Sequence, residues 1–538
     1  MRNRHWRSIT HASSLLIACA CFAIPGIGTA GAPAGDAPLT VPKAVCGAGD
    51  HPETALQGQV PAALRAAGFK GFNCNLELVG QSRGDGANWQ SAEYRDAIGN
   101  AGSQGRANGH EQGVVCAYHG TAFTTAGRTH VGVPVIDVTD NANPTPTAYL
   151  TTTSMLDPWE SLKVNERRQL LAADNGHNGG GGPEVDIYDL SSDCRNPQLL
   201  ASLPVGTGTD GSGVVHKIVG HEGSWAPDGL TYYGGDLRTS GGQYYAVDTV
   251  DPTHPKLITT WVPGFANVHG MSISDDGNRG YFVSLGTSGG VPGLTNPAVA
   301  ASNGLLIYDL SDIQARKPNA QAKLISTLFW KDGSGAQHTI PIKIAGKQYL
   351  VFVDEAGSGG FSSAAQEAGA CAAGMPPFPM ARIIDISDET KPKIVSRLML
   401  ETHDPANCGA VLPDLVGLSI FTYGSHYCSV DNREKATTLA CGYFNSGIRV
   451  FDIRNPARPT EIAYFNPPGT TTASTGSNHT SIGQWRSGGP DWCSAQVHLN
   501  AANGTLWTTC QDNGLLTLKF THGAWPFPES KTPAGQQN

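Results

Sequence analysis

The chain repeats a short pattern of apolar and polar positions that is typical of β-strands joined by tight turns. An apolar, often β-branched run ends in aspartate and one more apolar residue, and a polar turn, a proline and a second apolar run follow. Aspartate can accept hydrogen bonds from the turn amides, and proline can start a strand where no ladder donor is needed. The aspartates of the successive copies are Asp137, Asp189, Asp248, Asp309, Asp385 and Asp452, and the copy around Asp248 is the weakest match.

Two further strands fit between successive copies of this pattern. Residues 269–274 and 280–285 read as one hairpin, and residues 340–344 and 349–354 read as another. Four antiparallel strands in each unit, repeated six or seven times, predict an all-β fold of the β-propeller type. A two-domain β-sandwich protein is the alternative, which six copies in order disfavour.

The two ends of the repeat region complement each other. The last unit has three strands, at 495–499, 506–511 and 515–520, before the chain enters a proline-rich tail. Residues 75–80 read as an unpartnered fourth strand. We therefore expect a single propeller of about seven four-stranded blades, closed by the N-terminal strand completing the last blade, which removes two open sheet edges.

The repeated runs also resemble a known family. They read Val135-Ile136-Asp137-Val138-Thr139, Ile384-Asp385-Ile386-Ser387 and Val450-Phe451-Asp452-Ile453. They are similar to the LVIVD-repeat proteins, which are exported bacterial propellers, and the likeness covers most of residues 75–520. It implies the fold but no particular activity, because propellers serve binding, scaffolding and catalysis alike. Long inserts at 84–112, 285–303, 356–380 and 403–422 depart from a plain repeat, and we expect specificity to lie in them.

The N-terminus has the pattern of an export signal. Arg2, Arg4 and Arg7 precede an apolar stretch at 14–24 and small residues up to Ala32, and the stretch is too short to span a bilayer. A lipid on Cys19 is the alternative, because the preceding residues also resemble a lipoprotein cleavage box. We expect a signal peptide at 1–32, an N-terminal extension at 33–74, the propeller at 75–522 and a flexible tail at 523–538.

Composition limits the class of partner. The net charge of −9 over 538 residues comes without any basic tract, which argues against nucleic acid or an anionic membrane as the main partner. No later segment is apolar enough to span a membrane, and we expect a monomer. The ligand or protein partner is not defined by the sequence.

Cysteine usage agrees with export to an oxidising compartment. Of 12 cysteines, Cys19 and Cys21 fall in the signal, which leaves ten, an even number. Symmetric placement about polar turns predicts the disulfides Cys428–Cys441 and Cys493–Cys510, and reduced core cysteines are the alternative. No C-x-x-C motif occurs, so a structural zinc site is not expected. The pairing of the other six stays open: Cys46, Cys74, Cys116, Cys194, Cys371 and Cys408.

Histidines recur where the first strand of a blade should begin, at His221, His269 and His338, with His426 as an approximate fit. First strands line the central channel of a propeller, so these imidazoles are expected to converge and could hold copper, iron or zinc. A propeller with axial histidines is similar in plan to the carotenoid-cleaving oxygenases and to thiol oxidases of the selenium-binding-protein type, a likeness that carries over no residues. Glu222 or Glu355 could orient the ligands. Polar residues expected at the same channel mouth are His119, Glu160, Asp174, Glu222, Asp236, Asp354, Glu355, His498 and Asp512.

Two functions follow from these residues. The first is a module that binds a ligand or protein at the channel mouth and inserts, and the second is a metal-dependent, oxidase-like enzyme with the histidines as ligands. A third interpretation gives the channel residues no ligand, because such groups also bond to one another, to the backbone or to water. No H-E-x-x-H motif occurs.

Overall fold

The computed structural model describes most of the chain within the unit Leu39–Asn538. The described residues are 40–87, 89–96, 113–120, 129–176, 184–209, 215–218, 220–236, 242–263, 268–285, 302–360, 364–416, 418, 421–469 and 489–530. The expected signal peptide at 1–32, with Cys19, lies outside the described residues.

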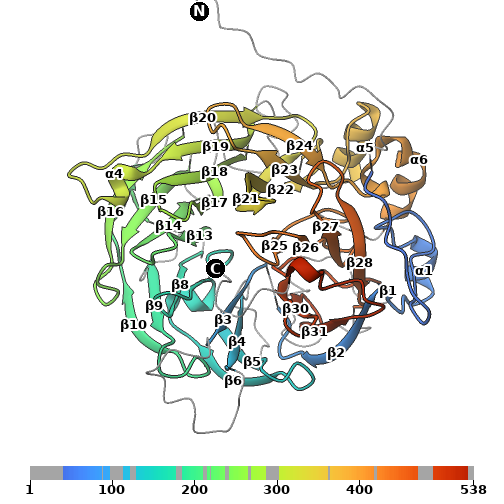
Figure 1. The fold of residues 1–538 in the computed structure, drawn as a ribbon, viewed down its shortest axis with the longest axis horizontal. Coiled ribbons are helices and arrows are strands. Elements are labelled where there is room, and N and C mark those ends of the chain that lie inside the picture. Colours follow the sequence, from blue (N-terminus) through green and yellow to red (C-terminus); the bar gives the residue numbers. More distant parts are fainter. Residues whose placement is uncertain are drawn as a thin grey trace, which may run out of the picture. The chain divides into compact units, whose positions relative to one another are not determined.

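Seven antiparallel blades of four strands are arranged as a β-propeller, which confirms the predicted fold (Figure 1). Blades 1 to 3 are β3 (Ser91–Arg95), β4 (Val115–His119), β5 (Val133–Asp137), β6 (Thr145–Leu150); β7 (Lys163–Asn165), β8 (Leu170–Asp174), β9 (Val185–Asp189), β10 (Gln198–Leu203); and β13 (Glu222–Trp225), β14 (Thr231–Asp236), β15 (Gln243–Asp248), β16 (Lys256–Trp261). Blades 4 and 5 are β17 (Val268–Ile273), β18 (Arg279–Leu285), β19 (Asn303–Asp309), β20 (Lys323–Phe329); and β21 (Ser334–Ile344), β22 (Lys347–Ala356), β23 (Ala381–Asp385), β24 (Lys393–Arg397).

Blades 6 and 7 contain strands from both ends of the propeller. Blade 6 is β25 (Cys428–Val430), β26 (Thr438–Gly442), β27 (Ile448–Asp452), β28 (Thr460–Asn466), and blade 7 is β29 (His498–Asn500), β30 (Thr505–Cys510), β31 (Gly514–Phe520) with β2 (Leu76–Ser82). Outside the blades lie the hairpin β11 (Thr207–Thr209) and β12 (Val215–Lys217), and the short helices α1 (Ala62–Ala66), α2 (Thr153–Leu156), α4 (Ser311–Gln314), α5 (Ala364–Ala372) and α6 (Cys408–Val411). The first strands β3, β13, β17, β21 and β25 lie nearest the centre in Figure 1.

The repeated aspartate ends the third strand of each of the first six blades. In every copy its Oδ1 accepts the backbone N–H of the residue two positions later, at 2.9 to 3.1 Å, as from Thr139 to Asp137 and from Arg454 to Asp452. The turn into the fourth strand is therefore fixed by a local hydrogen bond, as the sequence predicts. Apolar side chains fill the spaces between blades, for example Val351 of blade 5 against Leu439 of blade 6.

The N-terminal strand closes the ring, as predicted. β2 pairs antiparallel with β31, from Leu76 opposite Phe520 to Ser82 opposite Leu515. Leu76 is fully buried in a cluster of apolar side chains from blades 6 and 7. The sheet edges that an open ring would expose are thereby paired with each other.

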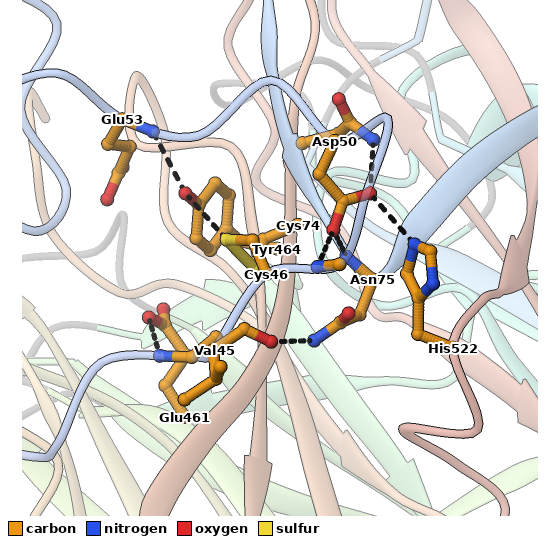
Figure 2. The surroundings of a disulfide bond; sticks show 12 residues. Val45, Cys46, Asp50, Glu53, Cys74, Asn75, Glu461, Tyr464 and His522 are labelled. Atoms are coloured by element: carbon orange, nitrogen blue, oxygen red, sulfur yellow. Dashed lines mark hydrogen bonds and ion pairs between the residues drawn. A yellow bond between two sulfur atoms is a disulfide. The ribbon is translucent and has the colours of Figure 1, made fainter.

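Residues before β2 add a further strand that the sequence analysis did not predict. β1 (Phe72–Cys74) pairs with β28 and gives blade 6 a fifth strand. Figure 2 shows how this segment is held: Cys46 and Cys74 form a disulfide, and Asp50 accepts the backbone N–H groups of Gly47 (2.8 Å) and Asn75 (2.9 Å). The extension is thus fastened at the junction of blades 6 and 7.

Five disulfides pair all ten cysteines that follow the expected signal. Cys428 faces Cys441 across β25 and β26, and both this bond and Cys493–Cys510 confirm the predicted pairs. The bonds that the sequence left open are Cys46–Cys74, Cys116–Cys194 and Cys371–Cys408. The last of these joins α5 to α6 and so links two of the long inserts.

The chain after blade 7 packs back on the propeller. The sequence predicts a flexible tail at 523–538. In the described part of it, Trp525 is buried against blade 7 and the hydroxyl of Ser530 lies 2.6 Å from that of Thr437. Residues 531–538 lie outside the described residues. Among the described residues, no helix has the length and apolar character needed to cross a membrane.

Two leucines of β2 provide a matched test of ring closure. Leu76 is fully buried and Leu78 is 46% exposed on the same strand. We expect Leu76→Ala to lower the free energy of unfolding by about 2–5 kcal/mol, because it leaves a cavity in blade 7, and Leu78→Ala to change it by less than about 0.5 kcal/mol. Urea denaturation of the oxidised protein measures both. Equal effects would contradict the burial of β2 in the last blade.

Candidate functional site

Five ionisable side chains from five consecutive blades meet on the axis of the propeller. They lie at the face where the first strands begin, which we call the start face. Glu160 lies shortly before β7, His221 immediately before β13, His269 in β17 and His426 shortly before β25. Glu355 is on β22, the second strand of blade 5. First strands surround the axis of a propeller, so residues at their beginnings converge even when they are far apart in the chain. We call these five residues the axial cluster.

Glu160 is in contact with all three histidines of the axial cluster. Its Oε2 lies 3.1 Å from Nε2 of His221 and 2.9 Å from Nε2 of His269, and its Oε1 lies 3.1 Å from Nε2 of His426. Glu355 adds a second carboxylate, with Oε2 at 3.2 Å from Nε2 of His426. All five residues are at most 6% exposed. The cluster is therefore a buried arrangement of three imidazoles around a shared carboxylate.

Backbone carbonyls fix two of the three histidine rings. The Nδ1–H of His269 donates to the carbonyl oxygen of Ala336 at 3.1 Å, and the Nδ1–H of His426 donates to that of Ser494 at 2.9 Å. A carbonyl oxygen only accepts, so Nδ1 carries the proton in both rings and Nε2 points to Glu160. This second-nitrogen hydrogen bond is the arrangement that orients histidines toward metal ions in proteins.

The donor set fits a transition-metal ion. Oxygens of Glu160 and Glu355 lie 3.1 and 3.2 Å from Nε2 of His426. Among the described residues, however, none of them lies at an angle that makes a hydrogen bond with this nitrogen. Buried polar atoms are nearly always bonded, so this nitrogen is suited to another kind of partner. The potential ligand atoms of Glu160, His221 and His269 lie within 4.8 Å of one another, as do those of Glu160, Glu355 and His426. Imidazole nitrogens with carboxylate oxygens suit copper, iron and zinc.

The carboxylates and imidazoles shift one another's pKa values. Burial by itself would lower the pKa of His269, but the charges of Glu355, Glu160 and Glu222 outweigh it and raise the pKa to about 9. Burial likewise opposes charge on His426, and Glu160 and Glu355 raise its pKa to about 10. Burial would raise the pKa of Glu160, but its histidine partners hold it well below the usual range. Protons and a metal ion would therefore compete for the same nitrogens.

Aromatic side chains pack on the histidines at the start face. The ring centroid of Trp159 lies 5.4 Å from that of His221, and the centroids of Trp89 and Phe444 lie 5.5 and 5.0 Å from that of His426. These apolar contacts reduce the access of water to the cluster, and electrostatic interactions are stronger where water is excluded.

The structure places His338 outside the axial cluster. Two contacts align β17 with β21: Nδ1 of His269 with the carbonyl of Ala336, and the hydroxyl of Ser272 with that of Thr339 at 2.6 Å. Both contacts join residues 67 positions apart. Ala336 is therefore the β21 neighbour of His269, and His338 lies two residues further along its strand.

His338 is held instead in the next layer along the axis. Its Nε2 accepts the backbone N–H of Cys428 at 3.4 Å, its Nδ1–H bonds to the side-chain oxygen of Gln337, and its ring stacks on Tyr427 with centroids 4.7 Å apart. Burial, and then the nearby charge of Lys163, keep its pKa well below the usual range. His338 is thus a neutral ring whose nitrogens are both engaged.

Several predicted channel-mouth residues lie at the ends of second strands and make other contacts. Asp174, at the end of β8, accepts the hydroxyl of Tyr245 at 2.5 Å, and burial raises the pKa of its carboxyl to about 8. Asp354, in β22, pairs with Arg382 at 2.7 Å. His119 and Asp236, at the ends of β4 and β14, are buried. Among the described residues that were predicted on second strands, Glu355 alone belongs to the axial cluster.

The other predicted residues lie at blade 7 and beneath the cluster. The ring nitrogen Nε2 of His498 lies 3.0 Å from the hydroxyl of Ser91, and Asp512 pairs with Arg83 at 3.3 Å. Glu222 lies beneath the cluster and accepts the hydroxyl of Tyr427 at 2.5 Å. From the sequence, Glu160 is predicted only as a channel-mouth residue, and Tyr427 is not predicted, although it directly follows His426.

Comparisons with known proteins assign neither a family nor an activity to the chain. No protein-family model matches the chain, and no curated protein matches it. Among solved structures, a putative 6-phosphogluconolactonase from Bacteroides uniformis ATCC 8492 is similar, with 13% identity, a TM-score of 0.45 and coverage of 75% of this chain and 94% of that chain. A protein from Lactobacillus plantarum has 12% identity and a TM-score of 0.40, with coverage of 74% and 92%. At these values neither likeness assigns a ligand or an activity.

Gly270, next to His269, offers a test of the packing at the cluster. A Cβ atom there would lie 2.2 Å from the carbonyl oxygen of Gln337 and 2.7 Å from the carboxyl carbon of Glu222, whereas one at the helical Gly409 would meet nothing within 4 Å. We expect Gly270→Ala to lower the free energy of unfolding by about 1–3 kcal/mol and Gly409→Ala to leave it unchanged or slightly raised. Denaturation curves compare the two. A Gly270→Ala protein as stable as wild type would contradict the close approach of β17 and β21.

Proposed function

We propose that this protein is a metal-dependent enzyme in which the axial cluster holds one first-row transition-metal ion, copper, iron or zinc. The observation that carries the proposal is the convergence of three Nε2 atoms, from three blades, on the carboxylate of Glu160. His221, His269 and His426 would be the nitrogen ligands, and Glu160 and Glu355 would supply oxygen. Zinc would contribute Lewis-acid chemistry alone, whereas copper or iron would also allow redox chemistry. We expect the reaction to be oxidative, which requires copper or iron.

Burial favours a metal site over a simple binding surface at the channel mouth. A propeller is also a common scaffold for binding modules, but a large partner at the mouth could not reach charged groups that are at most 6% exposed. Burying five ionisable groups is unfavourable unless they are paired or ligate a metal. A metal ion gives these groups a common partner.

The family and the cellular location are part of the proposal. We infer that the chain belongs to the LVIVD-repeat proteins, because the repeated runs end in the aspartates that fix the blade turns. We infer export because five disulfides are typical of oxidising compartments and because the N-terminus has the pattern of a signal peptide. A lipid on Cys19 stays the alternative to a free, exported chain.

Metal analysis of protein exported to a bacterial periplasm tests the site. We expect about one transition-metal ion per chain in wild type, and less than about a tenth of that in Glu160→Gln and in the double variant His269→Ala, His426→Ala. Loss of residues that merely orient ligands weakens metal affinity by about 10- to 100-fold, so loss of the ligands themselves should weaken it at least as much. Elemental mass spectrometry gives the metal content, and circular dichroism with disulfide counting verifies folding.

His338→Gln is the matched control, because His338 is also a buried axial histidine but lies outside the cluster. We expect it to retain the metal. A wild-type protein free of transition metal, or a His338→Gln protein that loses as much metal as the double variant, would refute the assignment of the site.

A further inference from the structure

A second feature lies along the axis, on the side of the axial cluster away from the start face. A cavity of about 350 Å³ is lined by residues of the first strands of all seven blades. Its volume is in the range of sites for small organic molecules. Its walls are partly apolar, with Met271, Ile340 and Val497, and partly polar, with Ser272 and Thr339. A compact molecule could enter it, whereas a folded protein or a polymer could not.

Four residues separate this cavity from the axial cluster, and we call them the channel floor: Lys163, Glu222, His338 and Tyr427. The carboxylate of Glu222 accepts the Tyr427 hydroxyl at 2.5 Å and the side-chain N–H of Gln337 at 3.1 Å. Nζ of Lys163 lies 3.7 Å from Oε1 of Glu222 and 5.4 Å from the centroid of the Tyr427 ring. The floor is therefore a connected polar layer.

Lys163 is the floor residue with donors to offer a ligand. The hydroxyl of Tyr427 is donated to Glu222, and both ring nitrogens of His338 are engaged. The ammonium group has three N–H donors, and its distance to Glu222 is that of an ion pair rather than a short hydrogen bond. The side chain of Lys163 is 22% exposed and that of Glu222 is 1% exposed. Burial lowers the pKa of Lys163, and the charges of Glu222 and Glu160 oppose this shift. The amino group of the pair thus faces the cavity, while the carboxyl group of Glu222 is covered.

The other charges along the cavity do not oppose an anion strongly. Glu93 pairs with Arg95 and accepts the indole N–H of Trp507. Burial raises the pKa of Glu166 to about 7, so part of its population is neutral near that pH. Asp431, also in the lining, accepts the backbone N–H groups of Thr437 and Thr438 at 3.0 Å. Arg433 is the second positive charge of the lining, and its guanidinium lies 3.4 Å from Asp275.

We propose that this cavity binds a compact organic molecule with a carboxylate group, which Lys163 anchors through Nζ while the molecule's apolar part packs against Met271, Ile340 and Val497. This inference goes beyond the metal site and does not rest on it, because the cavity and Lys163 are present whether or not the axial cluster holds an ion. Where both hold, the bound molecule lies across the channel floor from the metal.

Benzoate is the probe that tests this site, and benzamide is its neutral counterpart of nearly the same shape. Titration calorimetry on the full chain, with and without prior treatment with a chelator, gives both affinities. We expect benzoate to bind roughly 10- to 100-fold more tightly than benzamide, the factor that a charge-assisted hydrogen bond supplies. The preference for benzoate over benzamide should disappear in the double variant Lys163→Met, Glu222→Gln. Both residues are changed so that no buried charge remains without its partner.

Lys347→Met is the control, because Lys347 is a half-exposed lysine of β22 that pairs with Asp385 away from the cavity. It should retain the preference for benzoate. Chemical modification of the wild-type protein tests the site even if the double variant does not fold. Benzoate should slow the reductive methylation of Lys163, followed by mass spectrometry, and leave that of Lys347 unchanged.

The possible results separate this inference from the proposed function. Equal affinity for benzoate and benzamide, no binding of benzoate at millimolar concentration, or unchanged preference in the double variant would each overturn the anion site, whatever the metal content. Benzoate binding in chelator-treated protein would support this site independently of the metal proposal, which is decided by the metal content of the untreated protein.

Discussion

Closure of the ring by the pairing of β2 with β31 is the constraint on which the rest of the structure depends. A closed ring directs the first strand of every blade to one axis, and the alignment of neighbouring blades then sets which side chains meet there. The bond from His269 to the carbonyl of Ala336 is such a contact between blades, and it also sets the direction of the imidazole. An open stack of the same sheets would leave unpaired edges and would not bring Glu160 near His426.

Charge balance explains how the fold accommodates five buried ionisable groups. In the absence of metal, the raised pKa values of His269 and His426 mean that both rings are protonated at neutral pH, and they offset the two carboxylates. A divalent ion that replaces these two protons leaves the net charge of the cluster unchanged. The surrounding aromatic residues then meet the same total charge in either state, so metal uptake requires no large change in the packing around the cluster.

The sequence predicts the features that depend on local patterns, and it fails where alignment between strands decides the outcome. The aspartate turns, the closing strand at 75–80 and two disulfides follow from short patterns, and all are present. His338 stands before an apolar run as His269 does, but β21 begins at Ser334, well before His338, whereas β17 begins at Val268, next to His269. This difference in where the two strands begin leaves no mark in composition or spacing. β1 is only three residues long, so periodicity could not reveal it.

The two sides of the axial cluster differ in a way that bears on how the protein selects molecules. Aromatic rings pack on the histidines at the start face, and the opposite side has a polar floor and a cavity. The sequence predicts that specificity lies in the long inserts, two of which are joined by the Cys371–Cys408 disulfide. The cavity, however, is lined by first-strand residues, which the blades hold rigidly. Selection in the channel would therefore rest on fixed dimensions and on the charge of Lys163, because residues on paired strands have less freedom to adapt than residues in loops.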